Sequence, residues 1–334
     1  MPEIIVEIGN THEGSLGIAK SFIKMAAESG VKTVKFQMHI PEFEGIPDEP
    51  FRVKFSDQDA NRQSYWKRVN FSLENWVLIK QYCDELKVEF LCTPFSVEAA
   101  RVLFENKLVK RWKIGSGNAT DWPLIDYVSK TGLPLLISTG LSSEAELVKI
   151  KGRLVALGSW SNTTMLHCVS KYPASMNELD LHLMQDLSAF GCPVGYSDHS
   201  GNLYTAMYAM ARGASVIEVH MTPHRMFFGP DVSSSLLPDE IKSLVEFSKM
   251  CVLFEKSNRT KQQHFEEVES LRSLFRKGAY WSRALKPGEK VTLEDLSFLK
   301  PVGEIDVIDY EKLLGLTIAH ETSEGSPVKW SDIQ

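Results

Sequence analysis

The chain has 334 residues, of which 43% are hydrophobic and 24% are charged, and its formal net charge is −6 at pH 7. This length allows about two domains with a sizeable core, and the negative charge argues against nucleic acid or an anionic membrane as a partner. The five cysteines are scattered without metal-ligand spacing, so we interpret them as buried thiols of a reducing compartment. Without a signal-peptide pattern or a long apolar run, we expect a cytoplasmic protein.

Short runs rich in β-branched residues alternate with amphipathic segments along most of the chain. Alternating strands and helices require parallel pairing of the strands. Eight such units favour a (β/α)8 TIM barrel in the α/β class. The alternative is an open doubly wound sheet, but "GNTHEG" after the first run lacks the dinucleotide-binding spacing. The expected strands are Ile4–Ile8, Val31–Gln37, Val88–Thr93, Val109–Ile114, Pro134–Thr139, Thr163–Val169, Pro193–Ser197 and Val216–His220.

Two segments depart from this alternation. Residues 38–70 form a long connection rich in proline, aromatic and charged residues, and its place after the second strand puts it on the catalytic face of a barrel. After a barrel domain over residues 1–255, we expect a linker or solvated helix over 256–271. A small β-rich domain follows over 272–334, with turn signals at "KPGE", "KPVGE" and "SEGSP".

Residues at the carboxyl ends of barrel strands converge on one mouth. Lys35 and Lys113 lie in otherwise apolar strands, where an unpaired ammonium group is unfavourable. They predict either structural ion pairs with Glu7 or a neighbour, or two cationic groups that bind an anion. Hydroxyl groups at nearby strand ends favour an anion such as phosphate; these belong to Thr93, Ser96, Ser116 and Ser138.

His199 and His220 end two successive strands. A histidine at a strand end is most often a hydrogen-bonded structural residue, but two at the same depth on adjacent strands can share one ion. Asp231 follows the second of them, and two histidines with a carboxylate and water suit Mn²⁺, Fe²⁺ or Zn²⁺. His167, between Leu166 and Cys168, is by contrast expected in the core or behind the site.

The strand-end motifs form an ordered set: "EIGNTHEGSL", "VKFQMH", "LCTPFS", "KIGSG", "ISTG", "LHCVSKYP", "GYSDHS", "EVHMT" and "GPDVSSS", followed by the tail "RKGAYWSRALKPGEKVTLEDLSFLKPVGE". This set resembles the sialic acid synthase family of nonulosonate synthases, and the tail resembles that family's antifreeze-like (SAF) domain. The resemblance implies a metal-dependent enzyme that condenses phosphoenolpyruvate with an open-chain N-acylhexosamine, such as N-acetylmannosamine, to a nine-carbon 2-keto acid and phosphate. It also implies a domain-swapped homodimer in which each SAF domain caps the partner's barrel.

The same resemblance implies roles for individual residues. His199 and His220 would bind Mn²⁺ or Mg²⁺, and Glu7 would lie near the metal-bound water. Phosphoenolpyruvate would be held by Lys35, Thr93, Lys113, Ser116 and Ser197, while Gln37, Tyr172 and Asp231 would face the sugar.

Three positions depart from the family's pattern. Asn118 stands where the family usually has Glu or Asp, and Ser170 stands in place of an Asn. Lys300 replaces an Arg that commonly reaches the partner's sugar, and lysine lacks the bidentate fork. Because these positions concern the sugar or proton handling, we hypothesise an acceptor other than N-acetylmannosamine.

Two alternatives remain open. One is a catalytically silent relative that binds metal with sugar or phosphoenolpyruvate. The other is a synthase with a different acceptor, possibly a phosphorylated aldose, for which residues 38–70 offer Arg52, Lys54, Arg62 and Lys67.

Overall fold

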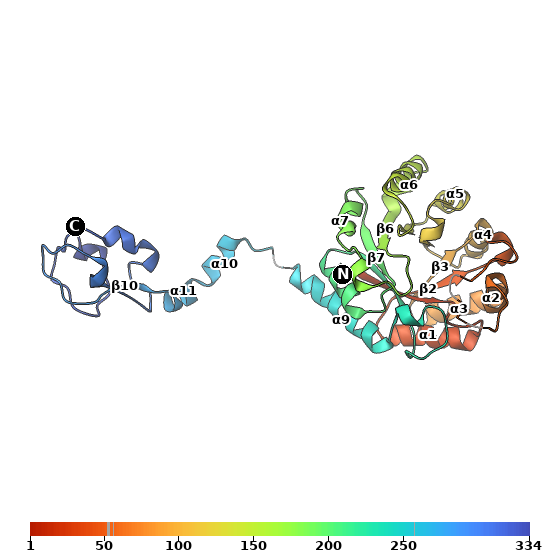
Figure 1. The fold of residues 1–334 in the computed structure, drawn as a ribbon, viewed down its shortest axis with the longest axis horizontal. Helices are drawn as coiled ribbons and strands as arrows, with labels where there is room; N and C mark the ends of the chain where they lie inside the picture. The colour runs from red at the N-terminus through yellow and green to blue at the C-terminus, as the bar shows by residue number, and fades with distance from the viewer. Residues whose placement is uncertain (52–53, 56, 257) are drawn as a thin grey trace. The chain divides into compact units, whose positions relative to one another are not determined.

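The computed structural model describes residues 1–51, 54–55, 57–256 and 258–334. The chain divides into two compact units, Met1–Lys256 and Ser257–Gln334 (Figure 1). No helix among the described residues is long and apolar enough to cross a bilayer.

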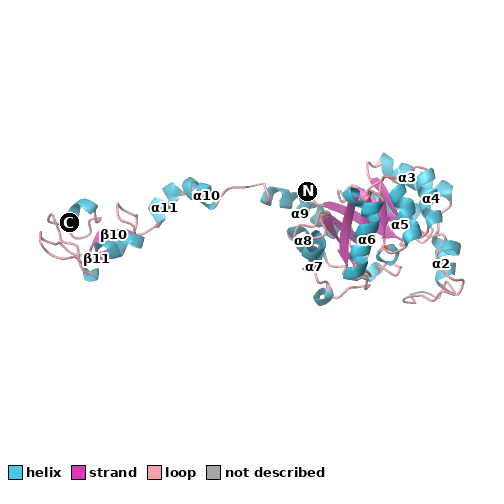
Figure 2. Ribbon diagram, turned by 90° about the horizontal axis from the view of Figure 1, so that it is seen from above, coloured by secondary structure: helices cyan, strands magenta, loops and turns pink. Residues whose placement is uncertain are grey.

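Parallel strands surrounded by helices form a nearly closed barrel in the first unit (Figures 1 and 2). Hydrogen-bonded ladders run in the order β3-β2-β1-β8-β7-β6-β5-β4, and β3 and β4 lie next to each other at the remaining seam. The predicted (β/α)8 fold is therefore confirmed, and the open sheet is excluded. The strands are β1 (Glu3–Gly9), β2 (Thr33–Met38), β3 (Glu89–Pro94), β4 (Trp112–Ile114), β5 (Leu135–Ser138), β6 (Thr163–Cys168), β7 (Val194–Asp198) and β8 (Val216–Met221), with the short β9 (Ser235–Leu236) beside β8.

Most of the helices in the first unit begin at polar residues whose side chains accept hydrogen bonds from the first turn. Ser15 accepts from the Ile18 N–H group, and Ser143 forms a capping box with Glu146. The apolar face of each helix then packs on the outward-facing strand residues, which gives one continuous core. The helices are α1 (Leu16–Glu28), α2 (Arg62–Val69), α3 (Leu73–Glu85), α4 (Val97–Glu105), α5 (Trp122–Lys130), α6 (Glu144–Ala156), α7 (Leu183–Ser188), α8 (Leu203–Ala211) and α9 (Pro238–Phe254).

The fourth predicted strand is shorter in the structure than in the sequence analysis. We expected it from Val109, but β4 begins at Trp112. Val109 is buried in the core without belonging to the strand. An apolar run predicts that its residues are buried, but it does not predict which of them form the hydrogen bonds of a sheet. The first residue of β4 could therefore not be predicted from the sequence.

Inward-facing side chains fill the barrel in layers of different chemistry. At the amino-terminal ends of the strands, Arg111 bonds with Glu3 and Glu89. Above them lies an apolar layer of five buried residues from five strands: Ile5, Leu91, Leu136, Leu166 and Val216. Side chains two residues further along each strand face the same interior, which places Glu7 and Lys35 in the next, charged layer.

Arg111, which directly precedes β4, joins β1, β2 and β3 at the amino-terminal end of the barrel. Its Nη1 lies 2.7 Å from Glu3 Oε2, its Nε lies 2.8 Å from Glu89 Oε1, and its Nη2 lies 3.1 Å from Thr33 Oγ1. Burial alone would raise the pKa of Glu3, but the hydrogen bonds and charge of Arg111 lower that pKa below its ordinary value of 4.5. This cluster is a stability element of the barrel.

Replacing Arg111 with methionine should lower the free energy of unfolding by about 2 kcal/mol, because two half-buried carboxylates lose their partner. A group with a lowered folded pKa stabilises above its unfolded pKa, and this contribution is lost as the pH falls through the folded value. The difference between variant and parent should therefore be full at neutral pH and shrink below pH 4.5. Urea unfolding across pH measures it, with Lys24→Met, at an exposed ion pair with Glu28, as control. A difference that does not change with pH would contradict this account.

The second unit is small and built around an antiparallel pair, β10 (Gly278–Trp281) and β11 (Leu296–Leu299). Its own core gathers Ala279, Trp281, Leu285 and Val291, among others. The segment expected as a linker or solvated helix carries two short helices, α10 (Lys261–Glu267) and α11 (Glu269–Phe275), which contain no buried residue.

The cysteines are all free, in agreement with the sequence analysis, but not all are buried. Cys83, Cys92 and Cys168 are buried, whereas Cys192 and Cys251 are partly exposed. Both lie at the periphery of the barrel and pack against its core from outside. The residue type predicts a thiol that avoids water, and it does not predict how deep the position lies.

Candidate active site

A group of four buried charges lies at the carboxyl-terminal end of the barrel. Lys35 Nζ lies 2.8 Å from Glu7 Oε2 and 3.9 Å from Glu218 Oε2, while Lys113 Nζ lies 3.5 Å from Glu218 Oε1. We call Glu7, Lys35, Lys113 and Glu218 the inner charge cluster. Its two ammonium and two carboxylate groups cancel formally. The prediction of ion pairs is confirmed, and the binding of an anion by the two lysines stays a prediction.

The two lysines differ in how well their charges are compensated. Burial would lower the pKa of Lys35, but Glu218 and Glu7 raise it above its ordinary value. Burial also acts on Lys113, and there it prevails, so the pKa of Lys113 is lowered although Glu218 lies beside it. Burial would raise the pKa of Glu218, but Lys113 and Lys35 lower it to about 2. Lys113 is the lysine that would gain most from a further negative partner.

Hydroxyl groups surround the inner charge cluster. Lys35 donates to Thr93 Oγ1 at 3.1 Å, Lys113 donates to Ser138 Oγ at 2.8 Å, and Ser197 donates to Glu218 Oε1 at 2.9 Å. Ser116 Oγ accepts from the Gly140 N–H group at 3.2 Å. Ser96, in contrast, accepts from the Ala99 N–H group and caps α4, so its hydroxyl group is occupied by the helix.

His199 and His220 face each other at the ends of β7 and β8, with ring centroids 5.8 Å apart. His199 Nδ1 lies 2.8 Å from the Val169 carbonyl oxygen, and Nε2 lies 3.0 Å from Tyr172 Oη. Burial and the neighbouring His220 lower the pKa of His199 to about 3. The ring is therefore neutral near pH 7, with Nδ1–H bound to the backbone and the Nε2 lone pair directed to the site, as in histidine ligands of metals.

The histidine pair fits a divalent cation that takes its other ligands from substrate or water. The described residues contain no group of three or more His, Cys, Asp or Glu side chains placed to hold one ion. The position of Asp231 in the sequence had suggested that it completes a three-ligand set with the two histidines. Among the described residues it does not form such a set. Closeness to a strand end in sequence does not fix where a loop carboxylate points.

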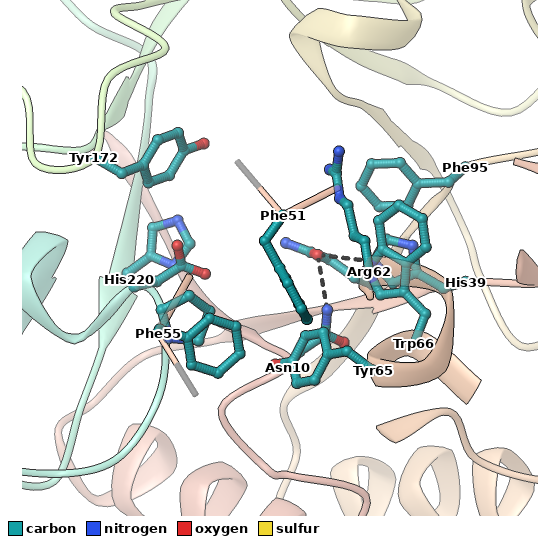
Figure 3. Close-up of a pocket in the computed structure, with 13 residues that line it drawn as sticks. Asn10, His39, Phe51, Phe55, Arg62, Tyr65, Trp66, Phe95, Tyr172 and His220 are labelled. Atoms are coloured by element: carbon teal, nitrogen blue, oxygen red, sulfur yellow. Dashed lines mark hydrogen bonds between the residues drawn. The ribbon is translucent and has the colours of Figure 1, made fainter. Parts of the chain in front are cut away.

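Next to His220 lies a cavity of about 210 Å³ (Figure 3). Tyr172 and His220 lie on one side of it, and His39, Trp66 and Phe95 lie on the other. The lining consists of Asn10, Gln37, His39, Phe51, Phe55, Arg62, Tyr65, Trp66, Phe95, Tyr172, His220, Pro230 and Asp231. The three residues expected to face the sugar, Gln37, Tyr172 and Asp231, thus line one cavity with His220.

Gln37 connects this cavity with the inner charge cluster. Its Nε2 donates to Glu7 Oε1 at 2.7 Å, and its Oε1 lies 3.1 Å from His39 Nε2. His39 is in turn fixed by Glu44 at 2.7 Å and is stacked between Trp66 and Phe95, with ring centroids 4.6 and 4.2 Å away. The orientation of the Gln37 amide is therefore set by groups on both sides.

Two residues at which the sequence departs from the family's pattern, Asn118 and Ser170, are not among the described residues that line this cavity. Asn118 Nδ2 is 3.3 Å from Asp121 Oδ2, within its own loop, and Asn118 is not among the described lining residues. Ser170 lines a second hollow of about 1070 Å³ between the loops that precede α6 and α7. Lys300 belongs to the second unit, where its ammonium group lies 5.6 Å from the centroid of the Phe275 ring. His167, as expected, is a buried structural residue, bonded to the Leu179 carbonyl group at 2.8 Å.

Sequence reasoning missed Glu218 and assigned no role to His39, which it placed at the end of the second strand. Glu218 interrupts the apolar run of β8 in the same way that the lysines interrupt theirs, so the criterion that found the lysines could have found it. The role of His39 depends on Trp66 and Phe95, which are distant in sequence, and no local signal marks it.

Comparison with known proteins shows to which family the chain belongs. The NeuB family model matches residues 22–258, and the SAF domain model matches residues 276–334. The N,N'-diacetyllegionaminic acid synthase of Campylobacter jejuni is 31% identical over 93% of this chain and 94% of its own length. Human N-acetylneuraminate-9-phosphate synthase is 30% identical over 72% of this chain and 68% of its own. The crystal structure of N-acetylneuraminic acid (sialic acid) synthetase from Leptospira borgpetersenii, in complex with citrate, superposes with a TM-score of 0.70 at 28% identity, over 81% of this chain and 93% of that one. The chain therefore belongs to the NeuB family, among synthases of the sialic acid type, and carries a SAF domain at its carboxyl-terminal end.

Proposed function

We propose that this protein condenses phosphoenolpyruvate with the aldehyde carbon of an open-chain N-acylhexosamine and releases a nine-carbon 2-keto acid and phosphate. The observation that carries the proposal is the placement of Lys35, Lys113, His199 and His220 at one barrel mouth, next to a cavity with polar and aromatic walls. The membership in the NeuB family supports the same reaction.

Phosphoenolpyruvate would bind over the inner charge cluster. Lys113 and Ser138 would meet the phosphate, since Lys113 is the lysine that lacks full compensation. Lys35, Thr93 and Ser197 would hold the rest of the anion, and Ser116 with the Gly140 N–H group would add donors. Because the cluster is formally neutral, further positive charge is needed for a trianion, and this supports a bound cation.

His199 and His220 would hold Mn²⁺ or Mg²⁺, which when bound would act as a Lewis acid toward the sugar aldehyde. Tyr172, Gln37 and Asp231 would orient the sugar against this end of the cavity. The reacting carbons would thus be brought together by positioning, which supplies much of the rate enhancement in bimolecular reactions.

The bond changes balance with one water. C3 of phosphoenolpyruvate forms a bond with the aldehyde carbon, and the oxygen of water adds to C2. The bond between C2 and the phosphate oxygen then breaks, which leaves the ketone. One proton of the water ends on the new hydroxyl group and the other on the phosphate. Glu7, held by Gln37 and Lys35, is the carboxylate that would receive the water proton in passing.

We also retain the homodimer with exchanged SAF domains and the cytoplasmic location as predictions. In that dimer, Lys300 of one subunit would approach the sugar bound by the other.

The reaction can be tested on the purified full-length protein with phosphoenolpyruvate, Mn²⁺ and a panel of N-acylhexosamines. Phosphate release and a product with the combined mass of acceptor and pyruvic acid are expected, and a chelator should stop both. Saturable phosphoenolpyruvate binding without turnover on any acceptor would instead support the catalytically silent relative.

A further inference from the structure

We propose that His39 is a positioning residue: Glu44 holds it as an imidazolium, and its Nε2–H group fixes the Gln37 amide in the orientation that donates to Glu7. The inference rests on the proposed function, in which Glu7 receives the proton of the attacking water. It follows from a chain of hydrogen bonds that has a carboxylate at each end.

The first end of this chain is the carboxylate of Glu7. Glu7 is buried beside the ammonium group of Lys35, at 2.8 Å, and a carboxylate in such a pair can only accept hydrogen bonds. The Gln37 amide, 2.7 Å from Glu7, must therefore turn its NH2 group toward Glu7 and its carbonyl oxygen away. That oxygen lies 3.1 Å from His39 Nε2 and accepts from the Asn10 amide at 3.4 Å. His39 consequently carries a hydrogen on Nε2.

The second end is the carboxylate of Glu44, whose side chain is 4% exposed. A 3₁₀ turn, Pro41–Phe43, brings Glu44 back to the end of β2, where its Oε1 accepts from the Ile40 N–H group at 2.6 Å. Its Oε2 lies 2.7 Å from His39 Nδ1, so this ring nitrogen must also carry a hydrogen. A neutral ring could donate to only one of its two acceptors. His39 is therefore an imidazolium whose charge Glu44 compensates.

The surroundings of the His39 ring favour a cation in a fixed position. The ring is stacked between Trp66 and Phe95, with centroids 4.6 and 4.2 Å away and planes inclined by 12° and 19° (Figure 3). Aromatic faces attract a cation, and two of them keep the ring in line with its hydrogen-bond partners. The guanidinium carbon of Arg62 lies 4.5 Å from the centroid of the same Trp66 ring.

The other charged and titratable groups near His39 are accounted for. Arg62 is paired with Glu49 at 2.8 Å. Burial, and after it the charge of His39, lower the pKa of His12 to about 3, so His12 is neutral near pH 7. Of the basic residues that the sequence offered for a phosphorylated acceptor, Arg52 lies outside the described residues.

Loss of the Nε2–H donor would release the Gln37 amide. If the amide turned over, its carbonyl oxygen would face the Glu7 carboxylate, and two acceptors at hydrogen-bond distance repel each other. Glu7 would then lose its donor and its fixed place beside the attacking water, which lowers the rate of the proton transfer. Phosphoenolpyruvate should still bind, because its phosphate is assigned to Lys113 and Ser138 on β4 and β5.

Two substitutions of His39 separate its hydrogen bond from its ring stack. His39→Phe keeps a ring between Trp66 and Phe95 but removes the donor, and it should lower kcat by about 10- to 100-fold while the Kd for phosphoenolpyruvate stays nearly the same. His39→Gln loses the stack but keeps an NH2 group where Nε2–H lies, and its kcat should stay within about 5-fold of the parent value. A phenylalanine variant as active as the glutamine variant, or more active, would overturn the inference.

His182→Phe provides a matched control, because His182 is exposed and its side chain forms no cap hydrogen bond with α7. It should change neither kcat nor the Kd. Thermal unfolding shows whether each variant is folded. If His39→Phe alone does not fold, since it leaves the Glu44 carboxylate buried without its partner, the double variant His39→Phe/Glu44→Leu takes its place in the comparison.

Nitrogen-15 NMR of the full-length protein labelled at its nine histidines tests the inference without turnover. The His39 signals are those that disappear in His39→Gln, and at pH 7 both of its ring nitrogens should carry hydrogen. An unprotonated Nε2 would contradict the proposal even if the condensation takes place. A doubly protonated ring in a protein that turns over no acceptor would instead support the hydrogen-bonded chain, and only the proposed function would fail.

Discussion

Replacing Glu218 with glutamine should lower turnover by about 10²- to 10³-fold and the free energy of unfolding by about 3–5 kcal/mol. Glu218 is buried and lies 3.5 Å from Lys113 and 3.9 Å from Lys35. Without its charge, two buried ammonium groups share Glu7 alone. The pKa of Lys113, which is already lowered, should fall further, and a neutral amine would no longer attract the phosphate.

Thermal or urea unfolding and steady-state kinetics measure the two effects of this substitution. Glu28→Gln is a matched control, because Glu28 is exposed and its ion pair with Lys24, at 3.8 Å, links neighbouring turns of α1. The control should leave both quantities unchanged. A Glu218→Gln protein with normal stability would mean that the inner charge cluster is not the tightly coupled unit described above.

Replacing His220 with asparagine should weaken Mn²⁺ binding by about 100-fold or more and abolish turnover, because His220 is one of the two imidazoles proposed to hold the ion. Electron paramagnetic resonance of free Mn²⁺ during a titration reports binding independently of activity. Phosphate release reports turnover in the same samples.

His224→Asn provides the control for this substitution. His224 is exposed and follows His220 closely along the chain, and its Nδ1 accepts from the Met226 N–H group. Its replacement should change neither Mn²⁺ affinity nor rate. Unaltered Mn²⁺ binding in His220→Asn would exclude the histidine pair as the metal site.

The fold could be predicted from the sequence because its signals are local and repeated. Each strand is a short apolar run, and most of the helices follow a polar cap such as Ser143. Lys35 and Lys113 could be found because a charge within an apolar strand must have a partner inside the protein. The two histidines were found from a different signal, their equivalent positions at the carboxyl-terminal ends of β7 and β8.

What could not be predicted depends on side chains that meet from distant parts of the chain. Ser96 precedes a helix, and the sequence does not distinguish a cap from a ligand there. The ring of His39 is stacked between Trp66 and Phe95, and these contacts follow only from the course of the long connection after β2. Asn118 departs from the pattern of the family, yet its amide donates to Asp121 and it is not among the described residues that line the cavity.

The apolar layer in the barrel separates two polar regions that have different tasks. This layer lies between the Arg111 cluster at the amino-terminal end of the barrel and the charged residues at the mouth, and it consists of Ile5, Leu91, Leu136, Leu166 and Val216. Substitutions in the Arg111 cluster are therefore expected to change the thermal stability of the barrel and to leave the residues of the candidate active site unchanged. Adaptation to a higher growth temperature could thus proceed through residues at the amino-terminal end of the barrel, without any substitution in the active site.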